Sequence, residues 1–292
     1  MPLVTTGELV GGAAGARSAV AAFNVITLEH VEAVIAGAES AGAPVVLQVS
    51  ENAVRFRYGR LLPLARAAVA AAERADVPVA LHLDHVQSAD LLRQAPEAGF
   101  SSVMYDAARL SYADNLAATR AAADWAHAQG LWIEAELGQI GGKAGLPALD
   151  AHAPGARTDP DQAHDFVAGT GVDALAVAIG SAHAMTTRTA TLDHGLLKRL
   201  SAALTVPLVL HGSSGVPDDG LVAAVAGGIA KVNVGTALNA AMTGAVRDFL
   251  ATHPEAVDSR KYLSVGRDAM AQEVARIIVV LGGARSGRAG LA

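Results

Sequence analysis

The chain has 292 residues, of which 52% are hydrophobic and 17% charged, and its net charge is −6. This composition favours packed helices and buried parallel strands over disorder, and an acidic balance without a basic run argues against nucleic acid or an anionic membrane as a partner. The chain has no cysteine, which excludes disulfides, thiolate zinc sites and a cysteine nucleophile, so any metal must bind His, Asp or Glu.

Neither a secretory signal nor a membrane span is predicted. The first residues lack a basic stretch followed by a long apolar run, and no stretch of about 18 residues is free of charge, glycine and proline. We therefore expect a cytoplasmic protein. The length suits one large domain or two small ones, and because no internal boundary is visible we expect a single domain over residues 1–292.

Short apolar runs alternate with longer segments of helical periodicity. The predicted strands are rich in Val, Ile and Leu without clean alternation, as strands buried on both faces should be. They are Ala19–Asn24, Pro44–Val49, Val79–Leu83, Ser102–Tyr105, Trp132–Leu137, Ala174–Ile179, Leu208–His211 and Lys231–Val234.

Helical segments lie between these strands. Thr27 is a candidate cap for a first helix whose apolar face includes Leu28, Val31 and Ile35. Further helices are predicted at Leu61–Arg74, Asn115–Gln129, Asp161–Thr170, Asp193–Ala203 and Asp218–Gly228. A C-terminal helical extension is predicted from about His253, and Gly141–Arg157 is the longest candidate loop, of the kind that often forms a lid or a binding loop.

Eight strand–helix units in a chain of this length indicate an α/β fold, a (β/α)8 TIM barrel with a C-terminal helical extension. A doubly wound open sheet is the alternative, but the glycine-rich dinucleotide fingerprint does not follow the first strand.

Polar residues stand where the predicted strands stop. Any one of them could be a helix cap or a turn residue, but capping alone does not explain polar groups at eight successive strand ends, which converge on one face of a barrel. They are Asn24, Ser50, Asp84, His85, Asp106, Glu136, His183, His211 and Asn233.

Three of the ten histidines follow different strands. His85, His183 and His211 come after the third, sixth and seventh strands. A single histidine there would more often be structural, whereas three of them suit a catalytic zinc ion with three protein ligands and an open position. Imidazole also binds other divalent metals, so zinc is a preference.

The HLDH segment at 82–85 places an acid beside a candidate ligand. Adjacent strand residues point to opposite faces, so Asp84 and His85 can both face one site only if the strand ends between them. We expect this, with Asp84 facing the substrate. The alternative is that Asp84 orients a ligand histidine.

Five ordered motifs carry a resemblance to a known family. They are HLDH at 82–85, IEAELGQIGG at 133–142, AVAIGSAH at 176–183, LVLHGSSG at 208–215 and KVNVGT at 231–236. They resemble the successive signatures of class II fructose-bisphosphate and tagatose-bisphosphate aldolases, the ketose-bisphosphate branch. The resemblance runs from AFNV at 22–25 to DSRKYL at 258–263.

The resemblance implies a role for each matching residue. His85, His183 and His211 would bind zinc, and Asp84 would exchange a proton with the substrate hydroxyl. Glu136 and Asp106 would lie near the metal, as a second metal position or as orienting groups. The dihydroxyacetone phosphate half would be held by Gly212, Ser213, Asn233 and Thr236, and the substrate chain would contact Asn24 and Ser50.

The implied activity is reversible aldol cleavage of a ketose phosphate. A zinc ion on the ketone oxygen acts as a Lewis acid and removes the need for a Schiff-base lysine. Lys231 lies at the start of its predicted strand, which disfavours a lysine mechanism. The resemblance and the C-terminal extension also imply a homodimer or homotetramer.

The chain departs from the family pattern at several positions. Lys143 and Ala144 replace the acidic pair of the loop that supplies the base for the carbon proton. Thr187, followed by Arg188, replaces a lysine near the phosphate. Gly235 and Asn239 stand where the family has Asp or Ala and a cation for the distal phosphate, and Ala184 replaces the glycine after the second zinc histidine. Asp150, His152 and Glu136 are the candidates for the missing base, with Asp150 preferred.

Three hypotheses follow from these departures. The first is an aldolase acting on a related ketose phosphate or bisphosphate. The second is an aldolase of altered scope that takes a non-phosphorylated or differently charged aldehyde. The third is a zinc-binding barrel without aldolase activity, either a binding protein or a metal-assisted hydrolase.

Overall fold

The computed structural model describes residues 2–138, 140–141 and 156–286. Within them, eight parallel strands form a closed barrel in chain order, with β8 returning to pair with β1. The strands are β1 Val20–Asn24, β2 Val45–Ser50, β3 Val79–Val86, β4 Ser102–Tyr105, β5 Trp132–Leu137, β6 Ala174–Val177, β7 Leu208–Leu210 and β8 Ile229–Val234. This confirms the predicted barrel, and most strand bounds agree with the prediction within one or two residues.

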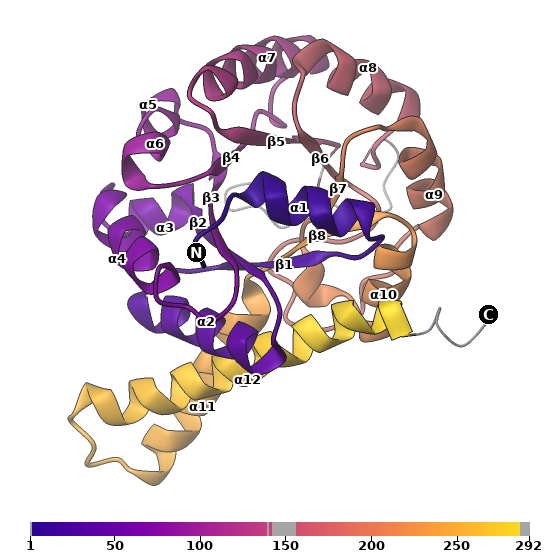
Figure 1. Ribbon diagram of the computed structural model, residues 1–292. Coiled ribbons are helices and arrows are strands. Elements are labelled where there is room, and N and C mark those ends of the chain that lie inside the picture. Colours follow the sequence, from indigo (N-terminus) through magenta and orange to yellow (C-terminus); the bar gives the residue numbers. More distant parts are fainter. Residues whose placement is uncertain (1, 139, 142–155, 287–292) are drawn as a thin grey trace.

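Helices surround the barrel (Figure 1). They are α1 Thr6–Gly15, α2 Leu28–Ala41, α3 Glu51–Phe56, α4 Leu62–Ala72, α5 Ala89–Leu92, α6 Ala95–Ala98, α7 Tyr112–Ala128, α8 Pro160–Thr170, α9 His194–Ala203, the 3-10 helix η1 Ser213–Gly215, α10 Asp218–Ala226, α11 Thr236–Thr252 and α12 Ser259–Ser286. The five predicted helices after the first correspond to α4, α7, α8, α9 and α10. Thr27 precedes α2 as predicted, but its side chain makes no capping hydrogen bond.

The barrel interior is apolar at the N-terminal end of the strands and polar toward their C-terminal end. Small apolar residues fill the N-terminal end, among them Ala22, Ala80 and Ala230, and Val10 of α1 packs against them. Figure 1 shows α1 lying across this end of the barrel. The sequence analysis predicted no helix there. Because α1 closes the N-terminal end, the opposite end, where the strands finish, is the one left to form a site.

The C-terminal extension is a helical hairpin. Helix α11 follows β8 directly, and α12 returns beside α11 and packs against α2, where Met270 and Val274 are fully buried. In Figure 1 the turn of this hairpin extends away from the barrel. The extension is confirmed, although the prediction placed its start near His253 and did not identify α11.

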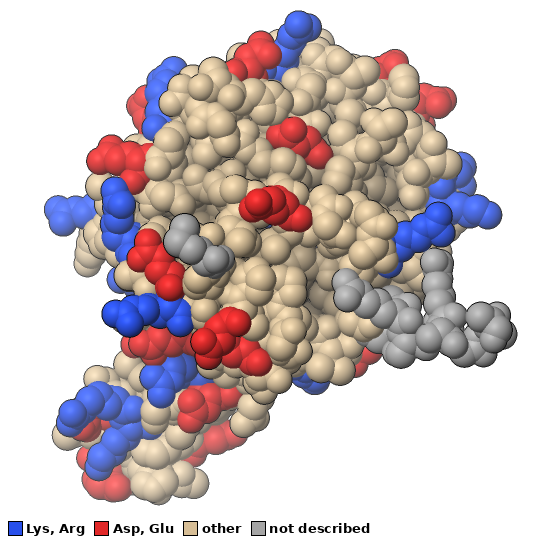
Figure 2. Space-filling model, in the orientation of Figure 1, with Lys and Arg blue, Asp and Glu red and all other residues tan. Residues whose placement is uncertain are grey.

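On the face of the molecule that carries α1, charged side chains of both signs lie mostly around the rim and over the helical hairpin (Figure 2). Figure 2, drawn from the side that carries α1, shows Lys and Arg around the rim and interspersed with Asp and Glu. Among the helices of the described residues, none combines the length and apolar character that a membrane crossing requires.

Candidate metal and substrate site

The strand-end residues meet at one cavity, as the barrel geometry requires. A pocket of about 260 Å³ opens at the C-terminal ends of the strands. Of the predicted site residues, those lining it are Asn24, Ser50, Asp84, His85, His183, Gly212, Asn233 and Thr236. Asp106, Glu136, His211 and Ser213 are buried beside it. Asp150, together with His152, Lys143 and Ala144, lies outside the described residues.

The backbone turns at His85 so that both members of the Asp84–His85 pair face the site. Strand β3 continues to Val86, so the expectation that it ends between the two residues is wrong. The register with β4 shifts between Leu83 and Val86, and His85 has φ +51°. A left-handed residue at a bulge re-aims its side chain, and for a non-glycine residue this costs of order 1–3 kcal/mol.

Three imidazoles and one carboxylate form a group suited to a divalent metal. One ligand atom from each of His85, Glu136, His183 and His211 lies within 4.8 Å of the others. The three ring centroids are separated by 4.9 Å, 5.1 Å and 5.8 Å. Three imidazole nitrogens beside one carboxylate and an open pocket match the donor set of a catalytic metal, so the residues fit such an ion.

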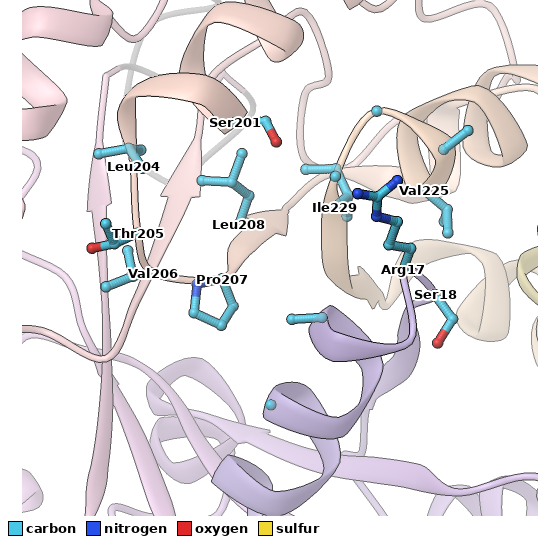
Figure 3. Close-up of a pocket in the computed structure, with 15 residues that line it drawn as sticks. Arg17, Ser18, Ser201, Leu204, Thr205, Val206, Pro207, Leu208, Val225 and Ile229 are labelled. Atoms are coloured by element: carbon cyan, nitrogen blue, oxygen red, sulfur yellow. The ribbon is translucent and has the colours of Figure 1, made fainter.

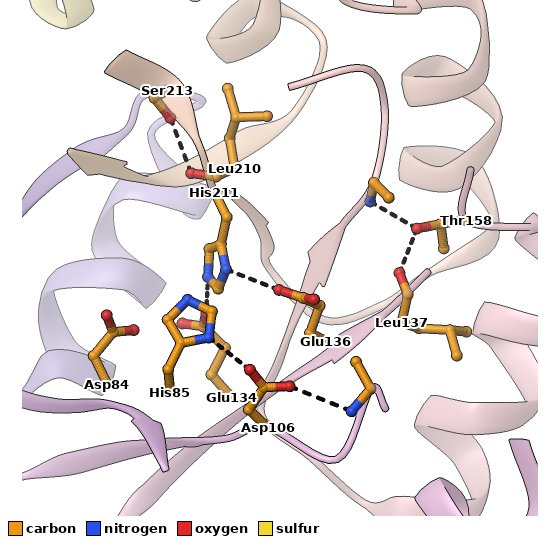
Figure 4. A network of polar contacts seen from close by, with 12 residues as sticks. Asp84, His85, Asp106, Glu134, Glu136, Leu137, Thr158, Leu210, His211 and Ser213 are labelled. Atoms are coloured by element: carbon orange, nitrogen blue, oxygen red, sulfur yellow. Dashed lines mark hydrogen bonds and ion pairs between the residues drawn. The ribbon is translucent and has the colours of Figure 1, made fainter. Parts of the chain in front are cut away.

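Carboxylates hold two of these histidines by the ring nitrogen that faces away from the group. His85 Nδ1 is 2.8 Å from Asp106 Oδ2, and His211 Nε2 is 2.7 Å from Glu134 Oε1 (Figure 4). A carboxylate on one imidazole nitrogen orients the ring and leaves the other nitrogen for a metal. Asp106, and not Asp84, is therefore the carboxylate that contacts His85 in the structure.

His211 lies between two carboxylates. Its Nδ1 is 3.1 Å from Glu136 Oε2, and its ring is fully buried. Burial lowers the pKa of His211, but the hydrogen bonds to Glu134 and Glu136 and their negative charges outweigh burial and raise the pKa to about 9. The position facing Nδ1 and Glu136 is therefore one that stabilises positive charge.

Asp84 is held by one oxygen and directs the other into the pocket. Its Oδ2 accepts a hydrogen bond of 2.8 Å from Asn24 Nδ2, whereas its buried Oδ1 has no hydrogen-bond partner among the described residues. Burial raises the pKa of Asp84, but the adjacent histidines, His85 first, outweigh burial and lower the pKa to about 2. A buried carboxylate with an unsatisfied oxygen at a pocket wall is placed to accept a proton from a ligand.

The segment after β7 approaches the loop after β6 too closely for a side chain. Gly212 has φ +66°, and a Cβ atom there would lie 2.6 Å from the backbone of Ala182. Ser213 is buried, and its hydroxyl donates to Leu210 O at 3.1 Å rather than lining the pocket. Ser214, which the sequence analysis did not single out, lines the pocket and accepts a hydrogen bond from Ala237 N. The pocket wall here is the N-terminus of α11, a favourable position for an anion.

The pocket is also lined by Asn239, a neutral amide that does not belong to the metal group. Asn239 is exposed at the pocket, and its Oδ1 is 3.2 Å from Nε2 of His30, which is buried. His30 Nδ1 is 3.0 Å from Thr27 Oγ1, and burial lowers the pKa of His30. The hydroxyl of Thr27 can donate to Nδ1, so that Nε2–H donates to Asn239 and the Asn239 NH₂ group is left for a ligand.

Arg188 does not take the place of the missing phosphate lysine. Its guanidinium donates to Val216 O at 3.0 Å and pairs with Asp218, and it is not among the residues that line the pocket. Ala184, at the position where the family has glycine, has φ +59°. The departure at 184 is therefore a strained backbone position rather than a lost ligand.

A larger hollow lies at the other end of the barrel. It measures about 600 Å³, and Figure 3 shows it between α1 and the starts of β7 and β8, with Arg17 and Ser201 in its wall. The helices α1, α9 and α10 end here, so they direct carbonyl groups toward it. It lacks the converging histidines and acids of the smaller pocket, which is why the smaller pocket is the candidate site.

Three buried polar residues lie next to the site although they were not predicted as part of it. Glu134, His82 and Lys231 are fully buried inside the barrel next to the site. A signal for them exists, because each stands two positions before a residue that was identified, in the pairs 134/136, 82/84 and 231/233. Residues two apart on a strand share a face, so these six positions all face the barrel interior.

Comparisons with known proteins identify what the chain resembles. Residues 4–286 match the family described as fructose-bisphosphate aldolase class-II. The YdjI aldolase from Escherichia coli K12 is 32% identical, with 96% of this chain and 97% of that chain covered and a TM-score of 0.81. A candidate fructose-1,6-biphosphate aldolase from Coccidioides immitis is 28% identical, with 97% and 98% covered and a TM-score of 0.83.

A third solved structure has the same fold at lower identity. Fructose-bisphosphate aldolase from Campylobacter jejuni is 22% identical, with 96% of this chain and 95% of that chain covered and a TM-score of 0.80. At that identity the likeness concerns the fold alone.

Proposed function

The chain belongs to the class II fructose-bisphosphate aldolase family and is an aldolase, a lyase; from that premise we propose that it cleaves and forms a ketose phosphate whose nucleophile half is dihydroxyacetone phosphate. The proposal includes a zinc ion held by His85, His183 and His211. The observation that carries it is the convergence of these imidazoles with Asp84 at one pocket. Nothing in the described site favours the hydrolase or binding-protein hypothesis.

The ion would supply Lewis acidity, withdrawing electron density from the ketone oxygen as the carbon–carbon bond breaks. Asp84 takes the proton from the hydroxyl on the carbon that becomes the aldehyde, using its Oδ1, while Asn24 keeps the carboxylate aimed at the pocket. Gly212, Ser214, Asn233 and Thr236 line the same pocket and hold the dihydroxyacetone phosphate half. The phosphate lies at the N-terminus of α11, where backbone N–H groups face it.

Exchange of the C3 proton of dihydroxyacetone phosphate with deuterium tests the proposed function. We expect NMR to show exchange with the zinc-loaded protein, because the half-reaction needs neither the aldehyde nor its binding site. The same measurement on Asp150→Ala, His152→Ala and Glu136→Ala identifies the base that replaces the loop acid, and full exchange in all three variants excludes these candidates. Absence of exchange in the zinc-loaded wild type would refute the proposed nucleophile.

The aldehyde side favours an acceptor without a second phosphate. Asn239 and His30 meet at that side of the pocket, and burial lowers the pKa of His30, which favours the neutral ring. A hydrogen bond to a charged group contributes roughly 1.5–3 kcal/mol. No Lys or Arg is among the described residues that line the pocket, and the guanidinium of Arg57, whose charge acts on His30, is bound to Ile26 O. We therefore expect poor turnover of fructose 1,6-bisphosphate.

Placing a cation at position 239 is expected to improve that turnover. Asn239→Arg should raise kcat/KM for fructose 1,6-bisphosphate by about 10–100-fold, the equivalent of one charge-assisted hydrogen bond. Thr243→Arg, one turn along α11 and exposed, adds the same charge outside the pocket and should have little effect. Equal gains in both variants would mean that net charge, and not this position, is responsible.

The helical hairpin supports an assembly of two or four copies. Among the described residues of α11, only Leu238 is buried, and Val257 at the turn is 94% exposed. Such a surface is typical of an element that packs against another subunit. We expect sedimentation at micromolar concentration to give a homodimer or homotetramer, and a single species near 29.5 kDa would contradict this.

A further inference from the structure

A lysine and a glutamate form an ion pair inside the barrel. Lys231 Nζ on β8 is 2.7 Å from Glu134 Oε2 on β5, and neither side chain is exposed. Charged residues are almost never fully buried unless they are paired, and a buried pair is often no more stabilising than two apolar residues of similar volume. Core packing by itself therefore does not explain why this pair is here.

Glu134 uses its second oxygen to hold a histidine of the metal group. Its Oε1 is 2.7 Å from His211 Nε2, while His211 Nδ1 faces Glu136 Oε2 at 3.1 Å (Figure 4). Lys231 can only donate, so it leaves Glu134 as an acceptor, and an acceptor at Nε2 requires the His211 proton to be there. When His211 is neutral, as metal binding requires, its other nitrogen, Nδ1, has its lone pair on the side of Glu136.

The pair is anchored at the other end of the barrel. Lys231 Nζ is 3.5 Å from His82 Nε2, and His82 Nδ1 is 2.7 Å from Ser102 Oγ. Ser102 Oγ donates in turn to Thr6 Oγ1 of α1 at 2.6 Å. The buried side of the metal group is thus connected through hydrogen bonds to the helix that closes the N-terminal end.

We propose that Glu134, held by Lys231, is a positioning residue that fixes the His211 ring with Nε2 as donor and Nδ1 as the metal-facing atom. This inference rests on the proposed metal centre. It predicts that removing the acceptor weakens metal binding even when the barrel core remains well packed. The effect of removing such a partner of a metal ligand is roughly 10–100-fold in metal affinity.

The test compares two double variants of similar volume. Glu134→Leu with Lys231→Met removes both charges and the acceptor, and Glu134→Gln with Lys231→Met removes both charges but keeps a carbonyl acceptor for Nε2. We expect cobalt affinity, measured by competition with a chelator, to fall about 10–100-fold in the first variant and to recover largely in the second. The visible spectrum of bound cobalt should change in the first variant. The melting temperature of the metal-free first variant should not fall, because an apolar pair replaces the ion pair.

Thr119→Val is the matched control. Thr119 is fully buried in α7, where its hydroxyl donates to Asn115 Oδ1, so the variant loses a buried hydrogen bond far from the histidines. Its cobalt affinity and spectrum should match those of the wild type. Wild-type affinity and an unchanged spectrum in the Leu–Met variant would overturn the inference and leave the proposed function in place.

A measurement on the unmodified protein is independent of whether the variants fold. In the zinc-loaded wild type, ¹⁵N NMR of the histidine rings distinguishes a proton on Nε2 from one on Nδ1. We expect His211 to carry its proton on Nε2, and a proton on Nδ1 with zinc on Nε2 would overturn the inference. A wild-type protein that takes up neither zinc nor cobalt would instead refute the metal centre, and with it the proposed function.

Discussion

Removal of the divalent ion with a chelator is expected to reduce aldol cleavage by roughly 10³-fold or more. A metal Lewis acid contributes several kcal/mol to charge stabilisation, and each 1.36 kcal/mol, approximately, is a factor of ten in rate. The reason in this protein is that the described site has no lysine free to form a Schiff base, since Lys231 Nζ is bound to Glu134. Zinc or cobalt added back should restore activity, and elemental analysis should give about one ion per chain with nitrogen distances of about 2.0–2.1 Å.

Histidine variants locate the ion. His85→Ala and His183→Ala each remove one donor of the group and should lower both metal content and turnover. His164→Ala is the control, because His164 is an exposed residue of α8 that pairs with the neighbouring Asp165 and does not belong to the metal group. If the purified protein contains no metal and gains no activity with zinc or cobalt, the proposed centre is wrong.

Asp84→Ala is expected to keep the metal and the fold and to lower turnover by about 10²–10⁴, the usual contribution of one general acid–base group. Asp84 lines the pocket, whereas the hydrogen bond to His85 comes from Asp106. Loss of the Asp84 carboxylate should therefore not displace His85. Turnover and metal content should be measured on the same preparation. Asp84→Asn, which keeps the shape and the contact with Asn24, should be nearly as slow if the proton is what matters.

Asp90→Ala is the control for this variant. Asp90 lies in α5 with its side chain 92% exposed, and its removal should change neither turnover nor metal content. The informative contrary result is a loss of zinc from Asp84→Ala. In that case Asp84 orients a ligand histidine, which is the alternative that its position beside His85 raises.

The sequence motifs include residues that face the barrel interior but were not predicted to do so. Glu134 and Glu136 are two residues apart on β5, and His82 and Asp84 are two residues apart on β3. Residues two apart on a strand point to the same face, so each pair lies on one face. In each pair only the residue at the strand end was predicted to belong to the site. Alternation places each pair on one face but does not say which polar groups meet across the barrel, so the ion pair between Glu134 and Lys231 was not predicted.

The serine that lines the pocket also differs from the one predicted to hold the phosphate half. Adjacent serines at 213 and 214 could each have faced the ligand, and the resemblance selected Ser213. In the structure the hydroxyl of Ser213 is used by Leu210 O, and Ser214 lines the pocket. The choice between neighbours depends on the left-handed backbone at Gly212 and on its contact with Ala182, which lies 30 residues earlier in the chain.

The sequence by itself determined the barrel, the end of it at which the candidate pocket opens and many of the residues that line that pocket. Apolar runs buried on both faces must be parallel strands, and the carboxyl ends of parallel strands in a closed barrel meet at one mouth. Only the tertiary structure decided that β3 bulges at His85, that Asp106 rather than Asp84 forms a hydrogen bond with His85, and that Lys231 and Glu134 form a buried pair. These features arise from contacts between strands that are distant in sequence, and local periodicity contains no information about which polar groups will find each other inside the barrel.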